Sequence, residues 1–407
     1  MNCRHCQNKL EHLFLDLGFA PPSNAYRTKE DLNKPEQNYP LRIMLCENCW
    51  LVQTVDFVDA DQMFNSEYAY FSSTSRSWLS HAEKYSKMIE KKLFLNSESL
   101  VVEVASNDGY LLNNFVKSGI PCLGIEPTDS TADAAKKLGI SVRKEFFGMK
   151  LARELADNGQ KADLIIGNNV YAHIPGINDF SNGLKILLKP SGTITLEFAY
   201  LLILIQKNEF DTIYHEHFSY LSLHAVNSIF ESAGLIIYDV DELSTHGGSL
   251  RVYGCHEESG FDVTQRVKDQ LQKEKDAGLL DLEIYMNFQQ KAEKVKNGLL
   301  EFLIEQKKLK KYVVGYGAAA KGNTLLNYGG VKQDLLPFVY DAATSKQGKY
   351  LPGSHIPILS PDYIKKHRPD YVLILPWNIA NEIKEQLAFI RDWGGKFVTA
   401  VPELTLS

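Results

Sequence analysis

The sequence contains no long run of apolar residues. Its longest, residues 200–205, is far shorter than the roughly 20 residues that a membrane-spanning helix needs. The first residues, beginning Met1-Asn-Cys3, lack the apolar core of a signal peptide. There is no excess of basic residues either, because the net charge is −6, and this argues against a nucleic-acid substrate. We therefore expect a cytoplasmic protein that binds neither membranes nor nucleic acids.

The segment 100–112 lacks two familiar nucleotide-binding patterns, a complete GxGxxG and the Gly-Lys-Ser/Thr ending of a P-loop. It contains a β-branched apolar run that predicts a buried parallel strand, followed by small residues that let a ligand approach the backbone. Its polar and small residues are Glu103, Ser106, Asn107, Asp108 and Gly109. Taken alone, the segment fits any first βα turn. Because it is acidic, it favours a cationic ligand such as S-adenosylmethionine over a polyphosphate.

Apolar runs and helical patterns alternate over the next hundred residues. Strands are predicted at 121–127, 163–170 and 192–198, and helices near 110–118, 129–138, 148–157 and 176–188. This βαβ series predicts a mostly parallel sheet. Glu126 ends a strand about 20 residues after the turn, the separation at which an acidic residue meets a ribose diol. Asn168 and Asn169 end the next strand with amides that suit the adenine or amino-acid part of the cofactor.

Four of the six cysteines form two CxxC pairs, and they are Cys3, Cys6, Cys46 and Cys49. Two such knuckles place four thiolates around one ion, and zinc is the metal most often held this way. With all four positions filled by protein, the zinc is expected to be structural. The alternative is a pair of redox or incidental motifs, which a cytoplasmic location disfavours. Cys122 and Cys255 are interpreted as ordinary buried residues.

Two clusters of aromatic and polar residues lie outside the predicted strands. Residues 68–75 combine phenols and hydroxyls, and they suit a lid over an active site and a plain linker equally well. Residues 214–217, Tyr-His-Glu-His, supply proton donors and acceptors near neutral pH. The HExxH spacing of a catalytic zinc site is absent. A surface loop without function remains the alternative for this second cluster.

The C-terminal part reads as a separate unit. A long charged helical stretch, about 262–310, leads to a second strand, glycine turn and helix start at 312–324. Lys321 and exposed amides suit phosphate there. Further strands are predicted near 336–341, 371–376 and 396–401, with a basic glycine-rich loop at 346–353. We interpret this unit as the holder of a phosphorylated, nucleotide-linked substrate.

Length and composition agree with several domains. A chain of 407 residues that is 44% hydrophobic is expected to form two or three domains with a substantial core. We place a zinc-binding and lid domain at 1–75, a cofactor-binding domain at 76–260, and a helical linker with an α/β domain at 261–407.

Together these residues resemble the S-adenosylmethionine-dependent C-methyltransferases of nucleotide-activated deoxysugars. The resemblance spans essentially the whole chain, and its order of motifs is highly specific. The runs at 234–240 and 248–253 fit the strand pair that closes a class I methyltransferase sheet. The motifs are the two knuckles, Glu-Tyr-x-Tyr-Phe-Ser-Ser-Thr-Ser at 67–75, Glu-x-x-Ser-Asn-Asp-Gly at 103–109, Gly-Asn-Asn-Val-x-Ala-His at 167–173, Tyr-His-Glu-His at 214–217, Thr-His-Gly-Gly-Ser-Leu-Arg at 245–251, and Gly-x-Gly-Ala-x-Ala-Lys-Gly at 315–322.

The resemblance implies an α/β protein with a class I methyltransferase domain and a Rossmann-like C-terminal domain. It implies methyl transfer to carbon 3 of a dTDP-, CDP- or GDP-linked 4-keto-deoxysugar. His217 is expected to be the base, with Glu216 as alternative or support, and Tyr214 and Tyr68 to bind the enolate oxygen or the sugar. The expected cofactor residues are Glu103, Ser106, Asn107, Asp108, Gly109, Glu126, Asn168, Asn169 and His173. The expected substrate residues are Tyr70, Lys321, Asn323, Arg251 and Lys349.

Three other interpretations stay open from the sequence. The methyl group could go to carbon 5. The turn at Gly315 and Gly317, with Asp341 near the end of the next strand, could instead bind NAD in an oxidoreductase or epimerase. The chain could also be a zinc-ribbon binding protein with a degenerate methyltransferase domain, which would have lost cofactor affinity.

Overall fold

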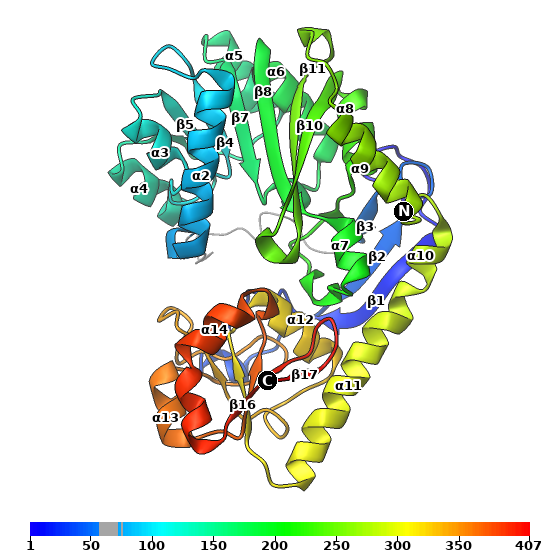
Figure 1. Ribbon diagram of the computed structural model, residues 1–407, viewed down its shortest axis with the longest axis vertical. Helices are drawn as coiled ribbons and strands as arrows, with labels where there is room; N and C mark the ends of the chain where they lie inside the picture. Colours follow the sequence, from blue (N-terminus) through cyan, green and yellow to red (C-terminus); the bar gives the residue numbers. More distant parts are fainter. Residues whose placement is uncertain (57–71, 75) are drawn as a thin grey trace.

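The computed structural model describes residues 1–56, 72–74 and 76–407. Tyr68 and Tyr70, with most of the predicted lid segment, lie outside the described residues. Three sheets organise the described part of the chain (Figure 1). The central sheet occupies the upper half of the view and the C-terminal sheet the lower half, with the N-terminal strands at the side between them.

The central sheet has seven strands in the order β10-β11-β8-β7-β4-β5-β6. Six of them run in the same direction, and only β11 runs opposite, since it pairs antiparallel with both β8 and β10. The strands are β4 (Val101–Val104), β5 (Cys122–Ile125), β6 (Ser141–Arg143), β7 (Ala162–Asn168), β8 (Leu188–Ala199), β10 (Leu235–Leu243) and β11 (Ser249–His256). The α/β fold class is confirmed, and β10 and β11 form the strand pair expected to close a class I methyltransferase sheet.

Helices cover both faces of this sheet, which is why its inner strands are apolar throughout. On β7, Leu164 and Ile166 pack into one buried cluster, while Ile165 between them packs into the other. The first cluster includes residues of α2 (Arg76–Leu93), α3 (Leu112–Lys117) and α4 (Asp129–Lys137). The second includes residues of α5 (Met149–Asp157), α6 (Ile177–Leu187) and α8 (Leu223–Ser232). The four helices predicted between 110 and 188 are present within two residues of their expected ends.

The N-terminal sheet was not predicted. It has the order β1-β2-β3-β9, with β1 (His12–Ala20), β2 (Tyr39–Leu45) and β3 (Val52–Thr54) paired antiparallel. Its last strand, β9 (Ser219–Tyr220), comes directly after the Tyr-His-Glu-His segment. The N-terminal part therefore holds the segment predicted to carry the chemistry. Because β9 belongs to this sheet, the boundary at 75/76 stays a prediction, and so does the one at 260/261.

The stretch 262–310 forms three helices rather than the single long stretch expected. These are α9 (Gln265–Asp276), α10 (Leu282–Met286) and α11 (Phe288–Lys308). The break follows from Gly278, which adopts φ +86° and donates its backbone N–H to Lys275 O, and from Asp281, whose side chain caps α10. Helix α11 then runs along one side of the molecule to the C-terminal domain (Figure 1).

The C-terminal sheet has the order β14-β13-β12-β15-β16-β17 and is parallel except for its last pair. Its strands are β12 (Val313–Tyr316), β13 (Val339–Tyr340), β14 (Ile358–Leu359), β15 (Tyr371–Ile374), β16 (Lys396–Thr399) and β17 (Thr405–Leu406). Helix α12 (Ala320–Tyr328) starts after the second glycine turn, and α13 (Ile364–His367) and α14 (Ala380–Gln386) follow. Short α7 (Leu201–Gln206) completes the central domain. In the described part of the chain, no helix is both long and apolar enough to cross a membrane.

Candidate functional site

The turn after β4 has an unusual backbone. Ala105 and Asn107 adopt φ values of +57° and +49°, a region that residues with a Cβ rarely occupy, and Gly109 follows with φ +78°. Such strained conformations gather at ligand-binding sites. Glu126, at the end of β5, fixes the turn, since its carboxylate accepts from the backbone N–H groups of Asn107 and Thr128, both at 2.9 Å.

Several buried polar atoms of this turn have no hydrogen-bond partner within the described residues. They are Glu103 Oε2, Ser106 Oγ and Asp108 Oδ1, and both side-chain atoms of Asn168 at the end of β7 share this property. Burial raises the pKa of Glu103 well above its ordinary value, and the carboxylates of Glu126 and Asp108 raise it further. Buried polar groups are normally paired, so this donor and acceptor set fits a polar, cationic ligand. The residues present therefore suit S-adenosylmethionine.

The short segment 72–74 lies against the same turn. Ser72 donates its backbone N–H to Asn107 Oδ1 at 3.0 Å, and Ser73 donates to Asp108 Oδ2 at 3.1 Å. The end of the predicted lid segment thus contacts two of the predicted cofactor residues. Asn169, another of them, adopts φ +52°, and its side-chain amide lies 3.0 Å from His246 Nε2.

His217 is held in one tautomer. Its Nδ1 lies 2.9 Å from Thr212 O, and because a carbonyl only accepts, Nδ1 carries the proton and Nε2 has the lone pair. Three rings surround the imidazole, those of Tyr214, His173 and Tyr220, with centroids at 4.1, 4.7 and 6.0 Å. Burial lowers the pKa of His217 well below its ordinary value. The imidazole is therefore neutral near pH 7 and able to accept a proton.

The neighbours of His217 are fixed by protein contacts. His173 Nδ1 donates to Glu216 O at 2.7 Å, and burial lowers the pKa of His173 to about 4. The structure thus places His173, predicted as a cofactor residue, beside His217, with ring centroids 4.7 Å apart. The carboxylate of Glu216 accepts from Asn24 Nδ2 at 2.9 Å, and burial raises the pKa of Glu216 to about 7. Glu216 therefore faces residues 21–38, the N-terminal segment between β1 and β2, which contains its partner Asn24.

Three predicted substrate residues make contacts within the protein. Arg251 is buried, and its guanidinium donates to Glu197 Oε2 at 2.7 Å and lies 4.4 Å from the ring centroid of Tyr85. Asn323 is also buried, and its Nδ2 donates to Ser23 O at 2.6 Å. Lys321 Nζ donates to Asn378 Oδ1 at 2.8 Å.

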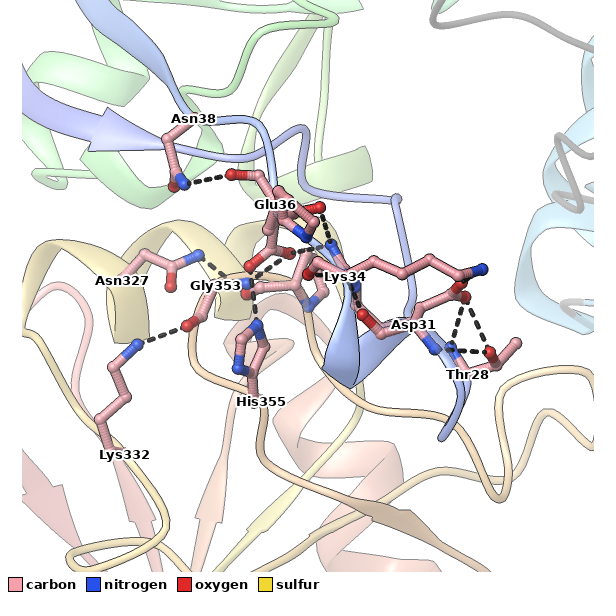
Figure 2. Close-up of polar contacts among 12 residues, drawn as sticks. Thr28, Asp31, Lys34, Glu36, Asn38, Asn327, Lys332, Gly353 and His355 are labelled. Atoms are coloured by element: carbon pink, nitrogen blue, oxygen red, sulfur yellow. Dashed lines mark hydrogen bonds and ion pairs between the residues drawn. The ribbon is translucent and has the colours of Figure 1, made fainter.

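Lys349, the fourth, lies in a loop that is bound to the N-terminal segment. Arg27 and Tyr350 exchange two backbone hydrogen bonds of 3.0 and 2.8 Å. Figure 2 shows Glu36 between the two segments, where its carboxylate accepts from Gly353 N at 3.1 Å and lies 2.7 Å from His355 Nε2. The N-terminal segment therefore positions the loop that carries Lys349.

Sequence reasoning missed Trp377 and Asn378. They lie three and four residues after the end of β15, at the carboxyl edge of the C-terminal sheet where open α/β sheets bind ligands. Trp377 Nε1 donates to Asp211 Oδ2 at 2.8 Å, and its ring centroid lies 4.4 Å from Lys321 Nζ. Their position after the strand predicted near 371–376 is the sequence feature that could have indicated them as site residues.

The four knuckle cysteines come together. Their sulfur atoms all lie within 4.8 Å of one another, with Cys3 and Cys49 at 3.6 Å and Cys6 and Cys46 at 3.4 Å. Gln53 Nε2 donates to Cys3 Sγ at 3.2 Å. Four convergent thiols of this kind can hold one metal ion. Cys122 and Cys255 are free thiols away from this cluster.

Comparison with known proteins decides the family. The chain is 34% identical to C-methyltransferase NovU of Streptomyces niveus over 401 residues, which cover 98% of this chain and 95% of that protein. The chain belongs to the C-methyltransferase family. Models of a zinc binding domain, a methyltransferase domain and a C-methyltransferase C-terminal domain match residues 3–64, 78–240 and 244–402 of this C-methyltransferase. The predicted enzyme class, an S-adenosylmethionine-dependent C-methyltransferase, is confirmed.

Similar solved structures cover less than half of the chain. The PH0226 protein of Pyrococcus horikoshii OT3 is 14% identical and has a TM-score of 0.38, over 46% of this chain and 94% of that one. Magnesium protoporphyrin IX methyltransferase of Synechocystis PCC 6803 with bound SAH is 14% identical with a TM-score of 0.35, over 44% and 83%.

Proposed function

We propose that this C-methyltransferase acts on carbon 3 of a nucleotide-linked 4-keto-deoxysugar, with dTDP, CDP or GDP as the nucleotide, in the synthesis of branched deoxysugars. The observation that carries the proposal is His217, a buried neutral imidazole whose proton sits on Nδ1 and whose Nε2 can accept another. A hydrogen beside a ketone is weakly acidic, so its removal needs such a base.

In this proposal His217 Nε2 takes the proton from the carbon next to the ketone. The ring of Tyr214 lies 4.1 Å from the imidazole, and its phenol is proposed to orient the sugar or bind the enolate oxygen. His173 holds the backbone of Glu216 and so fixes the segment that carries the base. Glu216, with a pKa raised to about 7, is the alternative base or a supporting group. Tyr68 is proposed to contribute a second phenol.

The cofactor is proposed to bind at the turn after β4. Glu126 is proposed to bind the ribose diol, and the carboxylate oxygens of Glu103 and Asp108 are proposed to bind the cationic groups. Ser106, Asn107, Gly109, Asn168, Asn169 and His173 complete the proposed cofactor site. The bound cofactor would supply a methyl group on a sulfonium, ready for attack by a carbon nucleophile in line.

We assign the C-terminal domain to the nucleotide part of the substrate. Lys346 and Lys349 give its loop positive charge, and the contacts of Glu36 hold this loop in place. Lys321, Asn323, Arg251 and Tyr70 are proposed to shape the substrate site directly or through neighbours. The four cysteine thiolates are proposed to hold a structural zinc ion, because a site with four protein ligands leaves no position for substrate.

The test uses the intact protein with S-adenosylmethionine labelled in its methyl group and a panel of dTDP-, CDP- and GDP-linked 4-keto-6-deoxysugars. We expect label in one sugar, located at carbon 3 by NMR. The His217→Asn variant is expected to lose at least 1,000-fold in turnover while it still binds S-adenosylhomocysteine. Label at carbon 5, or label in none of the sugars, would contradict the proposal.

A further inference from the structure

Two buried carboxylates, those of Glu209 and Asp211, precede the Tyr-His-Glu-His segment. Glu209 is 4% exposed and Asp211 is fully buried. Glu209 Oε1 and Asp211 Oδ1 have no hydrogen-bond partner in the described part of the chain. Burial raises the pKa of Glu209 to about 7 and that of Asp211 to about 6. Carboxylates in such surroundings require a nearby cation to remain ionised.

Lys321 is that cation. Its ammonium lies 4.4 Å from the ring centroid of Trp377, and one N–H donates to Asn378 Oδ1 at 2.8 Å. Burial lowers the pKa of Lys321, and the charges of Asp211 and Glu209 oppose this effect. An ammonium carries three N–H donors. In the part of the chain that the structure describes, only the bond to Asn378 uses one of them, so two are available to a ligand.

Asp211 sets the position of this lysine through Trp377. Its Oδ2 accepts from Trp377 Nε1 at 2.8 Å, which fixes the ring on which the ammonium rests. Gly247 packs closely against Glu209 and Trp377, because a Cβ at this glycine would lie 2.7 Å from Glu209 Oε1 and 2.8 Å from Trp377 Cη2. The central domain thus orients a ring and an ammonium that both belong to the C-terminal domain.

Helix α12 brings Lys321 toward the base. Thr324, one turn further along the helix, donates its Oγ1 to Ile213 O at 2.9 Å, so α12 lies against the residues between Asp211 and His217. The backbone of Thr212 holds His217 Nδ1. The positive charge of Lys321 is also felt at the imidazole, where it lowers the pKa of His217.

We propose that Lys321 stabilises the carbonyl oxygen of the substrate while His217 removes the neighbouring proton, and that Asp211 is the positioning residue for Lys321. The inference rests on the proposed function. In this step the C–H bond breaks, its electron pair enters the enolate, the proton moves to His217 Nε2, and the negative charge develops on the oxygen beside the ammonium.

The carboxylates explain why Lys321 faces the sugar rather than a phosphate. The charges of Asp211 and Glu209 act on the ammonium, and they would repel a phosphate that is already charged when it binds. A ketone oxygen is neutral in the ground state and becomes charged only as the proton leaves. Lys321 then favours the transition state over the bound substrate, which is the condition for catalysis.

The test measures hydrogen–deuterium exchange at the carbon next to the ketone, in D₂O with S-adenosylhomocysteine bound, beside steady-state methylation. We expect Lys321→Met to lower both the exchange rate and kcat by about 100- to 1,000-fold, with little change in KM or in the affinity for the nucleoside diphosphate alone. Lys321→Arg is expected to recover part of the rate. Lys365→Met is the matched control, since Lys365 is an exposed residue of α13 that lies over Phe389 at 4.9 Å.

Asp211→Asn and Trp377→Phe test the positioning role. Each disturbs the bond between these residues, and Trp377→Phe keeps a ring beneath the ammonium. We expect about a tenfold loss of kcat and exchange with unchanged KM and S-adenosylhomocysteine affinity. If Lys321→Met raised KM and weakened nucleotide binding while exchange at saturation stayed normal, Lys321 would bind phosphate and the inference would be wrong. If the wild-type protein exchanged no proton of any 4-keto sugar, the proposed function itself would fail.

Discussion

The protein contains the same strand, turn and helix start twice, once at β4 and once at β12. Each strand is four residues long and begins Val-Val, and each is followed by a residue with positive φ, Ala105 at +57° and Gly317 at +88°. The acidic residue after the next strand then accepts two backbone N–H groups. Glu126 accepts from Asn107 and Thr128, and Asp341 accepts from Ala318 and Ala343 at 2.7 Å each.

The two turns differ in what surrounds them. At the third strand position the first has Glu103 and the second Gly315, and the first leaves buried oxygens of Glu103, Ser106 and Asp108 without partners among the described residues. In the second, Ala318 O accepts from Tyr26 Oη at 2.5 Å and from Lys346 Nζ at 2.7 Å. The first turn thus keeps unpaired polar atoms that a ligand could bind, whereas side chains of the protein already bind a carbonyl of the second. The difference disfavours NAD at the second turn.

The largest expected effect is a loss of cofactor affinity when Glu126, but not Asp341, is replaced. Glu126→Ala should weaken S-adenosylhomocysteine binding about 100-fold, roughly 2.7 kcal/mol, because the turn loses its anchor and the ribose its acceptor. Asp341→Ala is the matched variant, and it should leave this affinity unchanged while it lowers the free energy of unfolding. Isothermal titration calorimetry measures the first effect and urea unfolding the second. Equal losses of cofactor affinity would remove the distinction between the turns.

Local sequence patterns predicted the helices and strands of the central domain well. They could not predict contacts between segments that are distant in the sequence. Helices α3 to α6 follow from periodicity and flanking glycines, which are properties of neighbouring residues. Strand β9 has only two residues and exists because Gln53 and Val52 pair with it from the N-terminal part. No local signal marks such a strand.

Roles of charged residues show the same limit. The motif containing Arg251 suggested a substrate contact, which stays a prediction, but it did not indicate that the guanidinium pairs with Glu197 on the neighbouring strand, fifty-four residues earlier in the sequence. The order of the motifs indicated the family because the motifs together include residues from every part of the candidate site. It could not show which of the conspicuous side chains face one another, since that depends on how β8, β11 and α2 pack.

Substitutions at the positive-φ residues of the two turns should change the free energy of unfolding in opposite directions. Gly317→Ala should lower the free energy of unfolding by about 2 kcal/mol, because φ +88° strains an L residue and the new Cβ would lie 2.6 Å from Cγ of the rigid Pro376 ring. Ala105→Gly relieves the strain at the first turn and should leave stability equal or higher by up to about 1 kcal/mol. Thermal and urea unfolding measure both. Destabilisation by Ala105→Gly would show that its conformation carries no strain.

The smallest expected effect is a pH dependence of cofactor affinity, and it concerns only the first turn. Glu103 is buried and its pKa is raised, so at lower pH the free protein holds a proton that a cationic ligand must displace. The apparent affinity for S-adenosylmethionine should therefore rise with pH, by up to about tenfold per unit, until the pH passes the raised pKa of Glu103. Binding should release protons, which calorimetry in buffers of different ionisation enthalpy detects. Glu103→Gln should flatten the dependence. At the second turn Gly315 occupies the equivalent position and has no titrating side chain, so a pH dependence that survives unchanged in Glu103→Gln would contradict the role of Glu103.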